Sequence, residues 1–199
     1  MSQEQLVDKR KLDLGCSFHK MDGYFGMDIL KSVGVDVVGD ACHMPFKDSS
    51  FMEIYSSYAL EHIQDQLSVI SELWRICNDS AEVKLILPHF SNPAYYDDLT
   101  HKFLYSTRTF EHYDHDLHKV TGHPNYLPNV NMKVVRTELR WWPPQVIGRK
   151  KLVKRIILNL LNGVINFLAN AHPFLCERIW CRWVGGFYEV EFNIVIIKR

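Results

Sequence analysis

The chain has 199 residues, 23 Lys and Arg against 23 Asp and Glu, and a hydrophobic fraction of 47%. This length suits one ordinary domain with a substantial core, and the composition excludes an intrinsically disordered polymer. A formal net charge of zero argues against a dedicated nucleic-acid-binding protein, so no nucleic-acid partner is expected. The charge is nevertheless segregated, because residues 1–147 carry fourteen basic and twenty acidic side chains whereas residues 148–199 carry nine and three.

The N-terminal residues and the cysteines predict a cytoplasmic protein. Residues 1–11 are polar and lack the apolar run of a signal peptide. The five cysteines are an odd number without a C-x-x-C pair, which indicates reduced thiols rather than a disulfide framework or a cysteine-based zinc site.

Short apolar runs that alternate with helical patterns predict βαβ units and a parallel sheet in the first half of the chain. Between the fourth and fifth strands, apolar residues at steps of three and four from Leu60 to Cys77 predict an amphipathic helix. Only nine residues, 15–23, join the first two strands, so we expect the first helix to be shortened to a turn. The expected strands are 12–14, 24–27, 35–38, 52–56 and 83–87.

The second half predicts further helices and two more strands. Ser106–Asp116 is expected to be helical, and 132–142 alternates like a strand. Residues 148–184 predict a helical insertion or lid, because a basic start is followed by charge-free helical residues and then, after Pro173, by a second helix. Residues 187–197 alternate between apolar and polar side chains and predict the final strand. The whole chain, 1–199, is expected to form a single domain.

Three residues at the ends of successive strands predict a small-molecule site. Gly15 allows a sharp turn and a close approach of the backbone to a ligand. Asp28 ends the second strand, where a carboxylate can accept both hydroxyls of a ribose, and Asp40 closes the third. The carboxyl ends of parallel strands meet at one edge, so the three should face one crevice. Taken singly, each aspartate could instead cap its own loop.

The crevice is predicted to bind a nucleoside without a pyrophosphate. The G-x-G-x-x-G fingerprint is missing, since Ser17 and Lys20 stand at its second and third glycine positions, and a pyrophosphate would lack its backbone cradle. S-adenosylmethionine fits that description.

Three motifs follow one another in this half of the chain. They are Leu12-Asp13-Leu14-Gly15-Cys16, the D-A-x-x-x-P-F-x-D-x-S-F pattern of residues 40–51, and residues 54–63, I-Y-S-S-Y-A-L-E-H-I. Together they resemble the class I S-adenosylmethionine-dependent methyltransferases, close to the small type 11 methyltransferase domains. The resemblance covers about residues 11–115 and makes them the cofactor-binding core. It implies a Rossmann-like α/β sheet, mostly parallel with an antiparallel last strand, S-adenosyl-L-methionine as the cofactor and methyl transfer as the activity.

The resemblance also implies which residues contact the cofactor. In the family the glycine loop passes the methionine end, the acid ending the second strand holds the ribose, and the acid after the third strand lies by the adenine. The serines that end the fourth strand would lie beneath the sulfonium. By position, the cofactor-binding residues are Gly15, Cys16, Asp28, Ile29, Asp40, Ala41, Ser56, Ser57 and His62. Ser17 departs from the pattern, because a second glycine is usual there.

Histidines after the fifth strand are the candidates for the acceptor side. An acceptor must be held in line with the methyl group, and a base is needed only for hydroxyl, thiol or protonated amine acceptors. Similar type 11 sequences carry D-x-T-H at the position of residues 98–101, so His101 and His89 are predicted to bind or deprotonate the acceptor. The alternative for each is a loop histidine bonded to backbone. We expect an oxygen or nitrogen of a small-molecule, glycan-derived or lipid-linked acceptor.

A histidine-rich stretch leaves a metal site open as an alternative. His112, His115, His118 and His123 could supply nitrogen ligands, but the expectation is a solvated helix end and no metal.

The basic start and apolar run of residues 149–171 have several interpretations. They predict either a peripheral membrane contact or a lid or homodimer helix. The run is too short and too rich in asparagine for a comfortable membrane span. For the chain as a whole, the alternative to an enzyme is a methyltransferase fold that has lost catalysis and serves as a binding module.

Overall fold

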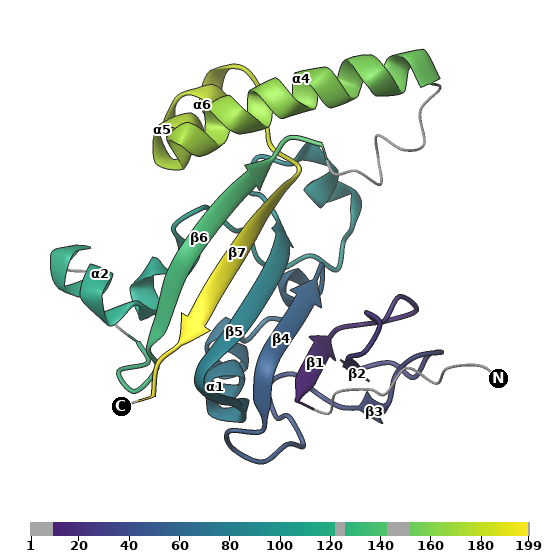
Figure 1. Cartoon of the computed structure of the whole chain (residues 1–199), viewed down its shortest axis with the longest axis vertical. Coiled ribbons are helices and arrows are strands. Elements are labelled where there is room, and N and C mark those ends of the chain that lie inside the picture. The colour runs from purple at the N-terminus through teal and green to yellow at the C-terminus, as the bar shows by residue number, and fades with distance from the viewer. Residues whose placement is uncertain (1–9, 122–125, 143–151, 199) are drawn as a thin grey trace.

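The structure is a computed structural model that describes residues 10–121, 126–142 and 152–198. Seven strands form one sheet in the order β3-β2-β1-β4-β5-β7-β6 (Figure 1). In chain order they are β1 (Lys11–Leu14), β2 (Phe25–Asp28), β3 (Val37–Val38), β4 (Phe51–Ser57), β5 (Cys77–Pro88), β6 (Met132–Arg140) and β7 (Glu189–Ile196). The first five strands pair in parallel, and β7 is antiparallel to both of its neighbours, β5 and β6. The predicted fold class is therefore confirmed.

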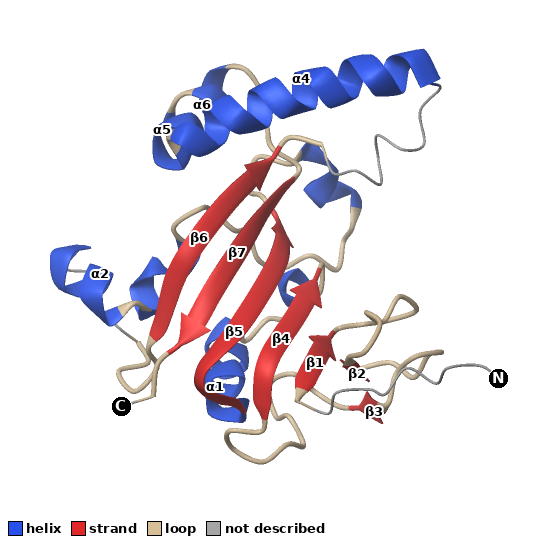
Figure 2. Ribbon diagram, in the orientation of Figure 1, coloured by secondary structure: helices blue, strands red, loops and turns tan. Residues whose placement is uncertain are grey.

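The helices are distributed unevenly along the chain (Figure 2). They are η1 (Leu60–His62), α1 (Gln66–Ile76), η2 (Pro93–Asp97), η3 (Thr109–Tyr113), α2 (His115–Thr121), α4 (Leu152–Ala171), α5 (Pro173–Arg178) and α6 (Trp180–Trp183). Residues 10–57 contain no helix, so all three crossovers between β1 and β4 are loops. The sequence predicted the loss of a helix only in the first of them.

Three predicted boundaries differ from the structure because polar side chains set them. The helix expected from Leu60 begins at Gln66, since Asp65 caps it by accepting a hydrogen bond from the Ser68 amide at 3.0 Å. Strand β5 begins at Cys77, directly after α1, whereas the sequence predicted a start at residue 83, because the polar residues 78–80 interrupt the apolar pattern. The helix expected over Ser106–Asp116 is a 3₁₀ turn followed by α2, whose start is capped by Asp114.

The hydrophobic core lies on one face of the sheet. Helix α1 buries Val69, Ile70, Leu73 and Ile76 there, at most 2% exposed. The strands contribute residues from alternate positions, including Leu12, Ile54, Leu85 and Phe192. This alternation leaves the intervening side chains of β4 to β7 on the opposite face.

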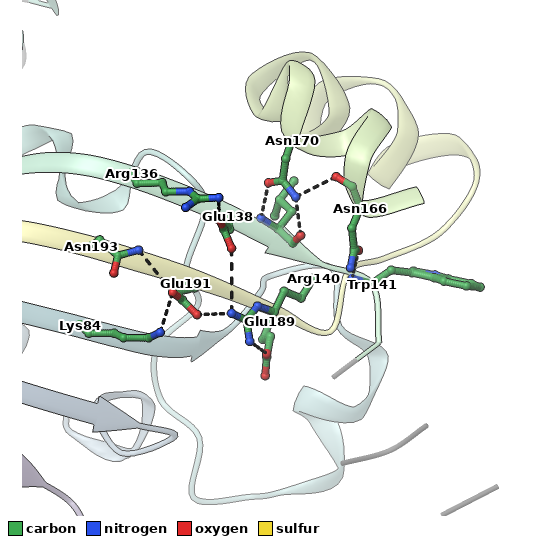
Figure 3. Close-up of polar contacts among 11 residues, drawn as sticks. Lys84, Arg136, Glu138, Arg140, Trp141, Asn166, Asn170, Glu189, Glu191 and Asn193 are labelled. Atoms are coloured by element: carbon green, nitrogen blue, oxygen red, sulfur yellow. Dashed lines mark hydrogen bonds and ion pairs between the residues drawn. The ribbon is translucent and has the colours of Figure 1, made fainter. Parts of the chain in front are cut away.

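The opposite face carries an ion-pair network along the antiparallel strands (Figure 3). Arg140 contacts Glu189 at 3.4 Å and also Glu191, and Lys84 contacts Glu191 at 2.8 Å. The two glutamates are 3% and 4% exposed, so their charges depend on these partners. The network fixes β5, β6 and β7 to one another.

Helix α4 lies across the end of the edge strand β6 (Figure 1). Asn170 accepts a hydrogen bond from the Leu139 amide at 2.7 Å and donates to its carbonyl at 2.8 Å (Figure 3). Asn166 accepts from the Trp141 amide at 2.8 Å, and Asn162 pairs with both backbone groups of Trp142. Asparagines at steps of four thus satisfy backbone groups at the end of β6 and just beyond it.

Candidate functional site

A cavity of about 390 Å³ opens at the carboxyl ends of β1 to β4. Small-molecule sites have volumes of about 300–1,000 Å³. The lining residues are Leu14, Gly15, Ser17, Asp28, Ile29, Leu30, Gly39, Asp40, Ala41, Tyr58, Ala59, His62 and Ile63. The strand order reverses between β1 and β4, and open α/β sheets bind their ligands at such a switch point.

Gly15 forms the floor of this cavity and cannot carry a side chain. Its φ of +75° is in the left-handed region, and a Cβ built there would lie 2.2 Å from the Cβ of Ala59. Ser17, where the family usually has glycine, also has a positive φ, of 45°. The loop therefore keeps the conformation expected for two glycines at the cost of strain at the serine.

Asp28 fixes the cavity wall formed by the loop after β2. Its two carboxylate oxygens accept hydrogen bonds from the amides of Ser17 and Leu30, both at 2.9 Å. Each oxygen retains a lone pair for a ligand hydroxyl. Asp40 is exposed and accepts a hydrogen bond from the Cys42 amide at 2.8 Å. Both the capping and the ligand-binding interpretations therefore apply to these aspartates.

Six of the nine residues predicted to bind the cofactor line the cavity, namely Gly15, Asp28, Ile29, Asp40, Ala41 and His62. The other three do not. Cys16 and Ser56 are buried, and Ser56 donates a hydrogen bond to the Leu14 carbonyl at 2.8 Å, which ties β4 to β1. Ser57 ends β4 beside the cavity without lining it.

The sequence analysis did not single out Tyr58, which lines the cavity and joins it to the ion-pair network. Its hydroxyl donates to the buried carboxylate of Glu189. Burial, followed by the charge of Glu189, raises the pKa of Tyr58 well above its usual value, so its hydroxyl keeps its proton. Its place directly after β4 was the one signal in the sequence, because the pairing with Glu189, 131 positions away, appears only in the fold.

His62 and His101 lie against one another, with ring centroids 4.7 Å apart. His101 donates from Nδ1 to the Tyr95 carbonyl at 2.8 Å, and its side chain is 13% exposed. Next to them, Glu61 is completely buried, and burial raises its pKa to about 7. His101 therefore contacts His62, which lines the cavity, but does not line the cavity itself.

His89, the other predicted acceptor residue, has no exposed surface. Its Nε2 pairs with Glu177 of α5 at 2.8 Å, and its Nδ1 lies 2.6 Å from Ser91 Oγ. Glu177 also accepts hydrogen bonds from the amide and hydroxyl of Thr107. His89 therefore joins α5 to the segment after β5 and does not line the cavity.

The predicted histidine-rich stretch is only partly described. His123 and the side chain of His118 lie outside the described part of the structure. Within the ranges that the structure covers, neither His112 nor His115 belongs to a group of three metal-ligating side chains.

Comparison with known proteins agrees with this geometry. Residues 12–83 match the family model described as a methyltransferase domain. A demethylmenaquinone methyltransferase of Streptomyces avermitilis is 35% identical over 57 residues, which are 29% of this chain and 24% of that protein. The aligned part of the chain therefore spans about a quarter of that relative.

Two solved structures share the fold over nearly the whole chain. Phosphoethanolamine N-methyltransferase 2 of Haemonchus contortus, solved with S-adenosyl-L-methionine, gives a TM-score of 0.53 at 16% identity over 96% of this chain and 49% of that one. An S-adenosylmethionine-dependent methyltransferase of Mesorhizobium loti gives 0.55 at 12% identity over 96% of this chain and 92% of that one. At these identities the likeness concerns the fold.

The sheet order and the antiparallel β7 give the chain the Rossmann-like fold of these methyltransferases. The chain has this fold, and its residues 12–83 match the family model described as a methyltransferase domain.

Proposed function

We propose that this chain is an S-adenosylmethionine-dependent methyltransferase whose cofactor binds in the cavity at the ends of β1 to β4. The observation that carries the proposal is the convergence of Gly15, Asp28 and Asp40, from three adjacent strand ends, on one cavity of about 390 Å³. No glycine-rich pyrophosphate cradle accompanies them, which favours a nucleoside ligand without phosphates.

The cavity residues have distinct roles in this proposal. Bound S-adenosylmethionine supplies an electrophilic methyl group on a sulfonium. Asp28 accepts hydrogen bonds from the ribose hydroxyls, Gly15 lets the methionine end pass close to the backbone, and Asp40 with Ala41 lies beside the adenine. The protein then contributes chiefly by holding the acceptor oxygen or nitrogen in line with the methyl group.

We propose His101 and His89 as the residues on the acceptor side, where the predicted role is to bind or deprotonate the acceptor. His101 lies against His62, which lines the cavity, so it is the better placed to meet an acceptor. For His89 the enclosed position favours positioning of α5 over contact with an acceptor.

Calorimetry with S-adenosylhomocysteine tests the cofactor assignment. Asp28→Ala should abolish binding, whereas Asp22→Ala, which removes an exposed carboxylate that does not line the cavity, should leave it unchanged. Equal binding by wild type and Asp28→Ala would overturn the site. If wild type neither binds the cofactor nor methylates any extract, the non-catalytic binding module is the better account.

We further propose that α4 lies in the plane of a membrane surface and that the acceptor is lipid-linked. The helix is long and apolar enough to cross a membrane by length and composition, and only 6% of its most apolar 18-residue window is buried. The side chains of Leu160, Val164, Phe167 and Leu168 are 59–75% exposed and carry no charge. Lys154 and Arg155 near its start, with Arg178 and Arg182 on α5 and α6, add positive charge that suits anionic headgroups.

The asparagine contacts favour an in-plane helix over a spanning one. Asn162, Asn166 and Asn170 bond to the backbone of β6 and its extension, so crossing a bilayer would break these bonds. It would also move three amide side chains into hydrocarbon, where an unsatisfied polar group costs several kcal/mol, about 4–8 on alkane-transfer scales. An in-plane helix keeps the bonds and turns only its apolar side toward the lipid.

A second cavity supports the lipid-linked acceptor. It has a volume of about 320 Å³ and lies between α4, α5, α6 and Phe187, which precedes β7. Its lining is almost entirely apolar and includes Ile165, Leu168 and Ile179. Because Leu168 also belongs to the exposed apolar side of α4, a lipid chain could pass from the membrane into this cavity.

Vesicle sedimentation tests the membrane proposal. Wild type should sediment with phosphatidylserine-containing vesicles at low salt and should be released as salt rises. Phe167→Asp should abolish sedimentation, whereas Asn159→Asp, an equal charge change at an exposed polar position of the same helix, should weaken it only slightly. No sedimentation at low salt, or self-association through α4 that Phe167→Asp abolishes, would favour the homodimer or lid alternative.

A further inference from the structure

Among the described residues, the buried carboxylate of Glu61 has no hydrogen-bond partner to stabilise its charge. Its side chain is 0% exposed, and neither oxygen finds a hydrogen-bond partner in another residue of the described chain. Leaving a buried carboxylate uncompensated costs several kcal/mol, and proteins resolve such a cost by protonation, by an ion pair or by a bound cation. Glu61 is therefore a feature that the cofactor site does not explain.

Two histidines complete a compact donor set around Glu61. One ligand-type atom each from Glu61, His62 and His101 lies within 4.8 Å of the other two. Backbone bonds hold this arrangement, because the amides of Lys102 and Phe103 donate to the Glu61 carbonyl at 2.7 and 3.3 Å. The segment that carries His101 is thus fixed against η1, which carries the other two residues.

Each histidine uses its Nδ1 in a hydrogen bond, so Nε2 is the nitrogen that can bind a cation, and that of His101 also lies 3.9 Å from the Asp98 carboxylate. His101 Nδ1 lies 2.8 Å from the Tyr95 carbonyl, which can only accept, so Nδ1 carries the proton. Thr100 donates its hydroxyl proton to Asp98 at 2.6 Å and therefore accepts from His62 Nδ1 at 2.8 Å. Metal-ligating histidines are oriented in this way by a carbonyl or a carboxylate-linked partner.

We propose that Glu61, His62 and His101 bind one divalent transition-metal ion, of the zinc or iron(II) type. Two imidazole nitrogens and one carboxylate are the protein ligands of catalytic zinc sites and of facial-triad iron sites, both of which leave positions open. His62 also lines the cofactor cavity, so the open positions of such an ion lie beside that cavity.

The metal site narrows the acceptor class if the proposed function holds. A divalent cation beside the cavity attracts a hydroxyl, phenol or carboxylate oxygen and repels a protonated amine. This consequence depends on the proposed methyltransferase activity. Metal binding itself does not, and it is therefore measured on the protein without cofactor.

Zinc titration of metal-free, tag-free protein, with metal content read by mass spectrometry and Co²⁺ spectra as a second readout, tests the site. Wild type should bind one Zn²⁺, the double variant His62→Ala/His101→Ala should lose it, and Glu61→Gln should weaken it strongly. Thr100→Val removes the hydroxyl that links His62 to Asp98 and should weaken binding about 10- to 100-fold. His172→Ala, at an exposed histidine before α5, should change nothing.

Two results would overturn the proposal. One is a wild-type affinity for Zn²⁺ no higher than that of the double variant, and the other is an equal loss in His172→Ala. An unchanged circular dichroism spectrum and an unchanged urea unfolding midpoint in the double variant would show that a loss of zinc is not a loss of fold. A protein that binds zinc but no S-adenosylhomocysteine would keep the metal site and contradict the proposed function.

Discussion

The two halves of the sheet are stabilised in different ways. Around β1 to β3, where no helix covers the crossovers, aspartate side chains hold the loops by accepting hydrogen bonds from backbone amides. Asp13 binds the Met21 amide at 2.7 Å, and Asp36 binds that of Gly26 at 2.7 Å. Around β5 to β7, side chains instead bind one another and the edge strand, through Arg140 and the asparagines of α4.

The two halves therefore depend on different features, namely backbone conformation in the first and contacts between side chains in the second. The first half needs particular backbone conformations, so its sensitive positions are small residues and loop aspartates. The second half needs particular side-chain pairs, so its sensitive positions are buried charges and amides. Substitutions that test each kind of dependence should therefore affect different measurements.

The largest effect is expected at Gly15. Gly15→Ala places a Cβ 2.2 Å from that of Ala59 at a φ of +75°, so the loop must move away from the cavity. We expect loss of measurable S-adenosylhomocysteine binding and a decrease of about 1–3 kcal/mol in the free energy of unfolding. Gly163→Ala on α4, where a Cβ meets nothing within 4 Å, is the control and should keep binding intact. Full binding by Gly15→Ala would show that the cofactor does not use this loop.

The second effect is expected at Arg140, the cation shared by two buried glutamates. Arg140→Met keeps most of the side-chain length but leaves Glu189 without a cationic partner, which should lower the free energy of unfolding by about 3 kcal/mol. Arg136→Met is the control on the same strand, because Arg136 is 71% exposed and its pair with Glu138 should contribute less than about 1 kcal/mol. Urea unfolding distinguishes the two, and equal losses would contradict the importance of burial.

The sequence predicted the first half better than the second for a physical reason. Gly15, Asp28 and Asp40 follow strands directly, and strand ends are visible as changes in hydrophobic pattern. The loss of the crossover helices was only partly predictable. The loop of residues 15–23 is visibly too short for a helix, but the later crossovers depend on tertiary hydrogen bonds such as that of Asp36. Local pattern does reveal a strand where apolar and polar side chains alternate. The final strand, predicted at 187–197, is observed at Glu189–Ile196.

The contacts of the second half could not be predicted, because they join residues far apart in the chain. Asn170 was visible as a polar residue in an apolar run, but its bond to Leu139 lies 31 positions away. His89 was visible as a histidine after a strand, but its burial depends on Glu177, 88 positions away. Glu61 belongs to the motif of residues 54–63, and only the fold shows that its carboxylate oxygens have no hydrogen-bond partner among the described residues.

The third effect is expected at the asparagine contacts. Asn170→Ala removes both hydrogen bonds to the completely buried Leu139, so the free energy of unfolding should fall by about 1–3 kcal/mol. Asn159→Ala, at an exposed asparagine of the same helix, should change it by less than about 0.5 kcal/mol. Hydrogen exchange at the Leu139 amide gives the direct readout, and unchanged protection in Asn170→Ala would contradict the role of the side chain.

The smallest effect is a pH dependence confined to the C-terminal helices. Burial alone would raise the pKa of Glu177, but hydrogen bonds from His89 and Thr107 outweigh it and leave that pKa below its usual 4.5. A carboxylate with a lowered pKa stabilises the folded state above pH 4.5, and this contribution is lost as the pH falls through the lower folded value. Attachment of α5 should therefore weaken in acid, with faster limited proteolysis around α5 and α6.

Glu177→Gln separates this group from other acidic residues. Glutamine still accepts a hydrogen bond from Thr107 but does not titrate, so the variant should attach α5 more weakly at neutral pH and show little further change between pH 5 and pH 3. Glu72 and Glu191 also have lowered pKa values and weaken the whole fold in acid, which is why the readout must be local to α5 and α6. If wild type and Glu177→Gln open at the same pH, the His89–Glu177 pair is not what attaches the helices, and the difference between the two halves would rest on the Arg140 network and the asparagines alone.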